Sequence, residues 1–258
     1  FRVRVLWTAA GPQPIPPGID YDLWDPATDP AIPQNFSADR YRDKGPNKGR
    51  LQQVFGLDER PNALLFGHVG RLVEQKGIDL ILAALPRLMA QPEVQLVILG
   101  SGSAALEERV RAVSAQYPGR VGTRLGYDEP LSHLVEAGSD VFLMPSRFEP
   151  CGLNQLYSLR YGTVPIVHRT GGLADTVVDA TPDALAAGIA TGFCFEPATA
   201  EALWSAIARA LALWRQPGVA WEKLAATGMR QDFSWATSAR RYEELYQIAI
   251  RHALAAAG

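Results

Sequence analysis

Short apolar runs that alternate with helical patterns are the feature that most restricts how this chain can fold. Each run is almost continuously apolar, and amphipathic patterns such as Gly77–Met89 lie between the runs. The clearest runs are Ala63–Val69, Val94–Gly100, Asp140–Met144 and Val164–His168. Strands that are apolar on both faces lie in parallel sheets between two layers of helices. The pattern therefore predicts an α/β fold, with a parallel sheet and helices on both faces.

The other patterns along the chain are weaker. Residues 1–7 have a strand pattern, 11–17 are rich in proline and indicate a linker, and 18–26 indicate a turn with exposed acidic side chains. Further strands are expected at 120–126 and near 192–195, and helices at 51–55, 104–116, 131–137, 200–215 and 235–257, with a short helix from Leu173. The resulting regions are a linker over 1–20, one domain over 21–234 and a C-terminal helix over 235–258.

The composition argues against several classes of function. A formal net charge of −2 gives no reason to expect binding to nucleic acid or to an anionic membrane, and no apolar run reaches the length of a membrane span. Two cysteines, Cys151 and Cys194, are too few for a disulfide framework or a cysteine zinc site, and they suit a reducing cytoplasm. The four histidines lack metal-binding spacing, so we expect no metal site.

A strand, a tight loop and a helix start meet at Glu149. The apolar run before it ends at Pro145, and helical spacing begins at Gly152. Ligands of parallel sheets bind outside the carboxyl ends of strands, where helix N-termini offer free N–H groups and a positive dipole. A carboxylate beside such an anion site suits the neutral, hydroxyl-rich part of a ligand. The alternative for Glu149 is a solvated side chain on an ordinary turn.

Two further loops have the features of anion sites. Arg71 and Lys76 lie between a strand and a helix. A cation in front of a helix N-terminus is repelled by the helix dipole. A bound phosphate therefore explains the pair of cations better than exposure to solvent does. Gly171 and Gly172 precede another helix and predict a backbone nest for phosphate. The alternatives are solvated surface charges for the first loop and a plain tight turn for the second.

An NAD-binding domain remains an alternative. Gly100–Ala105 matches the fingerprint G-x-G-x-x-A after a strand, and Asp128 follows roughly 20 residues later, where a ribose-binding acid would lie. This interpretation leaves the loops around Arg71 and Glu149 without a role. Tyr127 ends a strand at the same edge, where its ring either stacks on a base or is simply half-buried.

Taken together, these stretches resemble bacterial glycogen synthase and plant starch synthase. The residues that carry the resemblance are 70–77, 145–157, 161–165, 169–177 and 232–235, and it extends from about Gly18 to the last helix. It implies two Rossmann-like domains across a cleft, the glycosyltransferase-B arrangement, of which this chain holds the C-terminal half. It also implies retaining transfer of glucose from ADP-glucose to the nonreducing end of an α-1,4-glucan. ADP-glucose is then a substrate, no cofactor is needed, and the enzyme is cytoplasmic, or plastidic in a plant.

The resemblance implies roles for individual residues as well. Arg71 and Lys76 neutralise the diphosphate of ADP, and Tyr127 stacks on adenine. Glu149 holds the glucosyl group together with the backbone around Cys151, Gly152 and Leu153. Asn154 and Gln155 lie beside the phosphates. Gly171 and Gly172 stay candidate substrate-binding residues on the basis of their own pattern.

The sequence departs from the family pattern at its start. It lacks the family's N-terminal domain, with the Lys-x-Gly-Gly-Leu donor loop and a sugar-contacting histidine, and residues 1–17 do not resemble the family. We therefore expect the chain to bind ADP, to be inactive alone because the glucan acceptor needs the missing domain, and to self-associate through its C-terminal helix. A noncatalytic nucleotide-binding module from a truncated reading frame is the second hypothesis.

Overall fold

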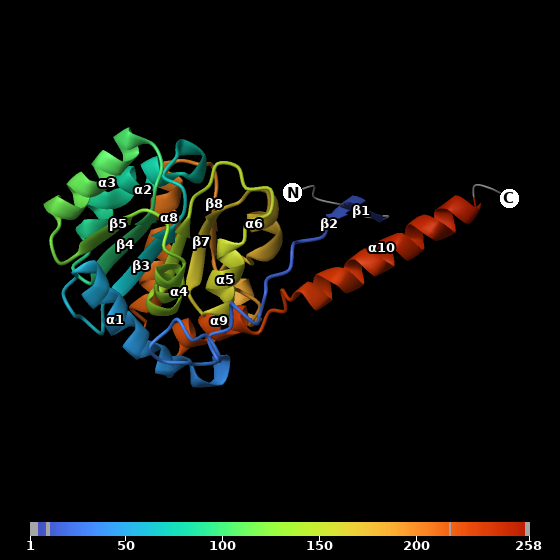
Figure 1. Ribbon diagram of the computed structural model, residues 1–258, viewed down its shortest axis with the longest axis horizontal. Coiled ribbons are helices and arrows are strands. Elements are labelled where there is room, and N and C mark those ends of the chain that lie inside the picture. Colours follow the sequence, from blue (N-terminus) through green and yellow to red (C-terminus); the bar gives the residue numbers. More distant parts are fainter. Residues whose placement is uncertain (1–4, 9–10, 217, 256–258) are drawn as a thin grey trace.

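The computed structural model describes residues 5–8, 11–216 and 218–255 (Figure 1). Its main sheet has six strands in the order β5-β4-β3-β6-β7-β8, and every neighbouring pair is parallel. The strands are β3 (Leu64–Val69), β4 (Val94–Gly100), β5 (Val121–Leu125), β6 (Val141–Met144), β7 (Val164–His168) and β8 (Phe193–Phe195). The predicted parallel sheet is confirmed.

The order of the strands reverses once. The chain runs from β3 through β4 to β5 at one edge, and it then crosses back to place β6 on the other side of β3. In open parallel sheets, ligands bind outside the carboxyl ends of the two strands at which the order reverses. The connections that leave β3 and β6 therefore mark the expected site.

Helices cover both faces of the sheet (Figure 1). Side chains alternate along each strand, so Leu64 and Phe66 of β3 join one core cluster and Leu65 joins the other. The first cluster includes α2 (Ile78–Met89), α3 (Ala104–Gln116) and α8 (Ala200–Trp214), and the second includes α1 (Gly45–Phe55), α4 (Glu129–Gly138) and α6 (Gly171–Thr176). The two layers of helices predicted from the apolar strands are present.

Three features differ from the sequence-based expectations. β1 (Val5–Thr8) pairs antiparallel with β2 (Gly11–Pro14), so the interpretation of 11–17 as a linker is wrong for these four residues. A two-stranded ribbon consists of edge strands only, where proline is tolerated. The short helices α7 (Pro182–Ala186) and α9 (Ala220–Met229) have no counterpart among the expected helices. The other short elements are η1 (Ala38–Lys44), η2 (Glu74–Lys76) and α5 (Asn154–Arg160).

The last helix, α10 (Trp235–Ala255), projects away from the sheet and its covering helices (Figure 1). Its first turn is anchored, because Ser238 Oγ donates to the Pro16 carbonyl at 3.0 Å and a Cβ on Gly18 would lie 2.5 Å from Trp235 Cα. Farther along, Ile250 is 59% exposed. None of the helices in the described ranges is long and apolar enough to cross a lipid bilayer.

A buried ion pair ties α1 to the start of two central strands. Lys48 Nζ lies 2.7 Å from Asp140 Oδ2, and both residues are more than nine-tenths buried. The ammonium also donates to the Ala63 carbonyl at 3.0 Å, and the Leu65 N–H donates to the Asp140 carboxylate at 2.8 Å. Such a pair costs desolvation to form, but losing one partner is costlier because the other charge is left buried and unpaired.

Lys48→Met is expected to lower the free energy of unfolding by about 3–5 kcal/mol, because it leaves Asp140 uncompensated. The double variant Lys48→Met/Asp140→Asn removes both charges and keeps a side-chain oxygen for the Leu65 N–H, so it should recover much of that loss. Urea denaturation followed by circular dichroism measures both. If the single and double variants lose equal stability, the pair is not the source of the effect.

Candidate functional site

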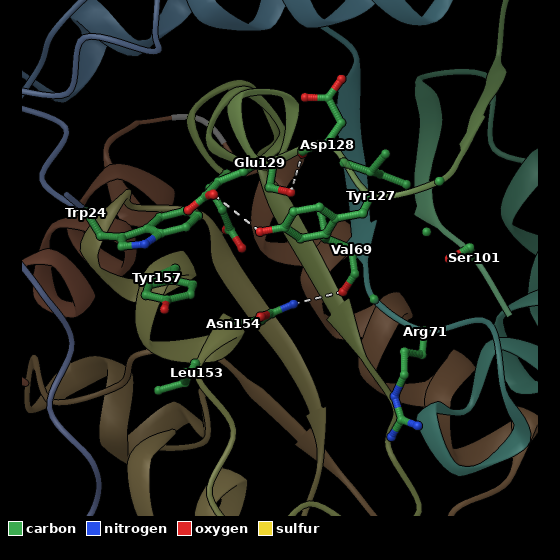
Figure 2. Close-up of a pocket in the computed structure, with 16 residues that line it drawn as sticks. Trp24, Val69, Arg71, Ser101, Tyr127, Asp128, Glu129, Leu153, Asn154 and Tyr157 are labelled. Atoms are coloured by element: carbon green, nitrogen blue, oxygen red, sulfur yellow. Dashed lines mark hydrogen bonds between the residues drawn. The ribbon is translucent and has the colours of Figure 1, made fainter.

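A cavity of about 390 Å³ opens at the carboxyl ends of β3, β4 and β5. Strand ends form one wall, including Arg71 after β3 and Tyr127 after β5, and side chains of α4 and α5 form the other. Figure 2 shows Tyr127 and Asn154 turned toward the middle of this space, with Arg71 at one end and Trp24 at the opposite end. The cavity therefore lies at the edge where strand order reverses.

The two connections at the reversal touch one another. Gly77 has a φ of +73°, and a Cβ there would lie 2.1 Å from the Pro145 carbonyl oxygen, so the approach requires glycine. Beside this contact, Lys76 Nζ lies 2.5 Å from Glu149 Oε2. Glu149 is 8% exposed, and its carboxylate also accepts from Ser146 Oγ at 3.4 Å. The structure thus brings together the cation and the carboxylate that the sequence analysis singled out in separate loops.

A second ion pair holds the loop before Glu149. The Arg147 guanidinium contacts both carboxylate oxygens of Asp79, at 2.7 and 2.6 Å. The backbone N–H of Arg147 donates to the Gln75 carbonyl at 2.9 Å. Hydrogen bonding from Arg147 holds the pKa of Asp79 below its usual value. Arg147 therefore joins the loop after β6 to η2 and α2, whereas Arg71 is exposed and lines the cavity.

The Gly171-Gly172 pair packs against the loop around Glu149. A Cβ on Gly172 would lie 2.0 Å from the Cys151 carbonyl oxygen, and one on Gly171 would lie 2.3 Å from that of Glu149. The Gly172 N–H donates to the Glu149 carbonyl at 3.1 Å. The prediction of a phosphate nest is therefore wrong for this N–H, which already has a protein acceptor. The glycines are needed for the close approach of two backbones.

Residues 151–155 do not all face the cavity. Leu153 and Asn154 line it, and Asn154 Nδ2 donates to the Val69 carbonyl at 2.8 Å. Gln155 is fully buried, and its Nε2 donates to the carbonyls of Cys151 at 3.0 Å and Gly152 at 3.2 Å. The expectation that Gln155 lies beside a ligand is corrected, because its side chain supports the loop from beneath.

The signals for NAD binding have structural explanations. Cβ atoms on Gly100 and Gly102 would lie 1.9 and 2.1 Å from the carbonyl oxygens of Gly70 and Leu72, so both glycines admit the neighbouring loop. Asp128 is the N-cap of α4, and its Oδ1 accepts from the Leu131 N–H at 2.9 Å. Tyr127 is 85% exposed at the rim of the cavity, so it is not the half-buried residue of the alternative reading.

Trp24 forms the end wall of the cavity and was not predicted to do so. Its ring stacks between those of His133 and Tyr157, at centroid distances of 3.7 and 3.8 Å. Asp29 accepts from His133 Nδ1 at 2.7 Å and from Tyr161 Oη at 2.5 Å. Burial favours the neutral acid, but these hydrogen bonds outweigh it and hold the pKa of Asp29 below its usual value. The stretch 18–26 was expected to be a turn with exposed acidic side chains; Asp20 and Asp22 are exposed, whereas Trp24 is buried in this stack.

Glu136 is a second cavity residue that the sequence analysis missed. It lies on α4 and is 2% exposed, and its Oε2 is 2.8 Å from Ser158 Oγ. Burial raises the pKa of Glu136 to about 8, against the smaller opposing effects of Ser158 and Lys44. The polar residues Glu129, Ser132 and Glu136 at the spacing of one helix face were the available signal, but this spacing does not reveal which cavity they line. No cluster of metal-binding side chains occurs within the described ranges.

Comparison with known proteins agrees with the fold. The profile of the family "Glycosyl transferases group 1" matches residues 48–224. A glycogen synthase from Thioalkalivibrio sulfidiphilus is 54% identical over 230 residues, which are 89% of this chain and 47% of the relative. The catalytic domain of starch synthase IV from Arabidopsis thaliana, bound to ADP and acarbose, superposes with a TM-score of 0.83 at 38% identity, over 91% of this chain and 48% of that one.

A more distant match concerns the fold alone. The C-terminal domain of a glycosyl transferase group 1 family protein from Francisella tularensis has a TM-score of 0.57 at 17% identity, over 82% of this chain and 95% of that domain. The chain spans about half the length of the glycogen synthases it matches. The expected resemblance to glycogen and starch synthases is confirmed, and the chain belongs to the glycosyl transferases of group 1.

Proposed function

We propose that this chain is the donor-binding half of a glucosyltransferase that moves glucose from ADP-glucose to the nonreducing end of an α-1,4-glucan, with retention. The observation that carries the proposal is the contact of Lys76 with Glu149 at the switch point of the sheet. In a sugar nucleotide the glucosyl carbon is bonded directly to the β-phosphate. A cation for phosphate and a carboxylate for sugar hydroxyls must therefore lie next to each other, and a bare nucleotide would not need the carboxylate.

The proposed arrangement assigns residues of the cavity, and of the loops beside it that carry Lys76 and Glu149, to parts of the donor. Arg71 and Lys76 contact the diphosphate, and Tyr127 stacks on adenine at the rim. Glu149 and the backbone of Cys151, Gly152 and Leu153 hold the glucosyl group, with Asn154 beside the phosphates. Gln155, Gly171 and Gly172 act indirectly, by holding that loop in place. The similarity to a starch synthase that was solved with ADP supports the nucleotide.

The chemistry follows from the charges. As the bond between glucose and phosphate breaks, negative charge develops on the leaving diphosphate. Preorganised cations stabilise this charge more in the transition state than in the ground state, and such electrostatic stabilisation is commonly the largest contribution to catalysis. Glu149 fixes the sugar while the bond breaks. In this proposal a second domain holds the glucan acceptor. The matched region is 47% of the glycogen synthase relative, so the remaining half of such a protein has room for that domain.

Arg71→Ala and Lys76→Ala should each weaken ADP binding roughly tenfold or more, because each removes a charge-assisted contact to diphosphate. Titration calorimetry with the purified chain measures the affinity. Arg111→Ala is the matched control, since it removes an exposed arginine of α3 that is paired with Glu107 and Glu108. Unchanged affinity in both site variants would contradict the phosphate assignment.

Glu149→Ala should abolish the difference in affinity between ADP-glucose and ADP, and ADP binding itself should stay nearly unchanged or tighten. The reason is that the substitution removes the group that binds glucose and releases Lys76 from its partner. Calorimetry with both ligands gives the ratio, and Glu108→Ala on α3 is the control. Equal weakening for both ligands would instead identify Glu149 as a structural residue of the loop.

The chain alone should transfer negligible glucose from ADP-glucose to glycogen, because orienting the acceptor and excluding water require a second wall. A radiolabelled transfer assay measures turnover, and sedimentation on the same sample measures self-association through α10. Turnover on the order of 1–1,000 per second would refute the half-site proposal and mean that a second copy completes the cleft. ADP binding without any turnover in the presence of a separately supplied N-terminal half would favour a noncatalytic module.

A further inference from the structure

Glu136 is the least explained polar residue of the cavity. Three residues of α4 line the cavity, namely Glu129, Ser132 and Glu136, at the spacing of one helix face. Seven residues of helix span about 10 Å, so Glu136 lies about that far along α4 from Glu129. Glu129 is exposed at the rim, where its Oε2 is 3.3 Å from Tyr127 Oη, whereas Glu136 is 2% exposed. Glu136 thus forms the deep end of the cavity.

The charge of Glu136 is not compensated by an ion pair within the described ranges. The charge of Lys44 acts on the Glu136 carboxyl group, but Lys44 Nζ donates to the Glu136 backbone carbonyl at 2.9 Å, the Tyr161 carbonyl at 2.9 Å and Thr163 Oγ1 at 2.8 Å. Burial raises the pKa of Glu136 to about 8, so at pH 7 the acid is largely protonated. An uncharged acid does not repel a diphosphate bound in the same cavity.

The hydrogen bonds of Ser158 define which oxygen of Glu136 is available. Ser158 Oγ lies 2.8 Å from both the Asn154 carbonyl oxygen and Glu136 Oε2, yet a hydroxyl has one hydrogen to donate. With Ser158 donating to Asn154, the protonated Oε2 of Glu136 donates to Ser158 Oγ. The carbonyl oxygen, Oε1, accepts no hydrogen bond from the described residues, so it is the acceptor left for a donor on a molecule bound in the cavity.

We infer that Glu136 binds a ribose hydroxyl of the nucleotide and so selects ribonucleotides at this site. The inference rests on the proposed function, because it concerns the nucleotide of the same cavity. Tyr127 places the base at the rim and Arg71 places the diphosphate at the edge of the cavity. The part of the nucleotide between them that reaches the deep end is the ribose, whose 2′- and 3′-hydroxyls are donors. Asp128, the acid that sequence spacing offers for ribose, caps α4 instead.

The test compares ADP, 2′-deoxy-ADP, 3′-deoxy-ADP and UDP by calorimetry at pH 7. The unmodified chain should bind ADP roughly three- to tenfold more tightly than at least one deoxy analogue, the range expected for one hydrogen bond. Glu136→Met replaces the acid with a side chain of similar size that has no acceptor oxygen. This variant should bind ADP only as tightly as the unmodified chain binds that deoxy analogue. Glu136→Gln should keep the discrimination, since its amide donates to Ser158 and still presents an oxygen.

Several results would overturn the inference. Preserved discrimination in Glu136→Met, or no discrimination by the unmodified chain, would show that Glu136 does not contact the ribose. A changed ratio of ADP to UDP affinity, with the ribose preference intact, would mean that it contacts the base. If Glu136→Met does not fold, Ser158→Ala serves in its place, and unaltered ribose discrimination there overturns the inference. Absence of ADP binding by the unmodified chain would refute the proposed function itself, whereas ADP binding without ribose discrimination would refute this inference alone.

Discussion

The contact between Lys76 Nζ and Glu149 Oε2 joins two loops that are 73 residues apart in the sequence. It exists because the strand order reverses between β3 and β6, which places the connections that follow these strands next to each other. Gly77 then lets the two backbones approach to a distance that no side chain would permit. The Arg147–Asp79 pair fastens the same two segments. A cation and a carboxylate consequently lie in direct contact, on loops that hold each other.

Buried polar groups hold the framework beneath this edge. Lys48 pairs with Asp140 between α1 and the start of β6, and Lys44 donates to acceptors on α4 and on the segment that leads into β7. Burial lowers the pKa of Lys44 to about 7, and the charge of the neighbouring Asp140 opposes this shift. Because a buried polar group without a partner is costly, these contacts oppose any sliding of α1 against α4 or the sheet. α4 in turn carries Glu136 and stacks His133 against Trp24, so the deep end of the cavity depends on them.

Much of the fold and part of the site could be predicted from local patterns. Continuous apolar runs identified the strands, and loops between a strand and a helix identified Arg71, Lys76 and Glu149 as residues of one sheet edge. The errors have a common cause. Sequence spacing says that Gln155 and Gly172 lie in these loops, but not in which direction a side chain or an N–H points, and both are directed to protein acceptors. Similarly, Gly100 and Gly102 fit a dinucleotide fingerprint, although their lack of a side chain serves to admit the loop after β3.

The sequence by itself determined the class of fold, the sheet edge at which a ligand is expected and the residue types that suit a sugar nucleotide, because periodicity and turn residues act over a few positions. Only the tertiary structure decided which of those residues meet. Trp24 reaches the cavity because its stretch packs across α4 and α5, more than 100 residues farther along the chain. Glu136 lies at the deep end of the cavity because α4 packs it against Ser158 of α5. Contacts between distant segments depend on how helices pack on the sheet, and no local pattern encodes that packing.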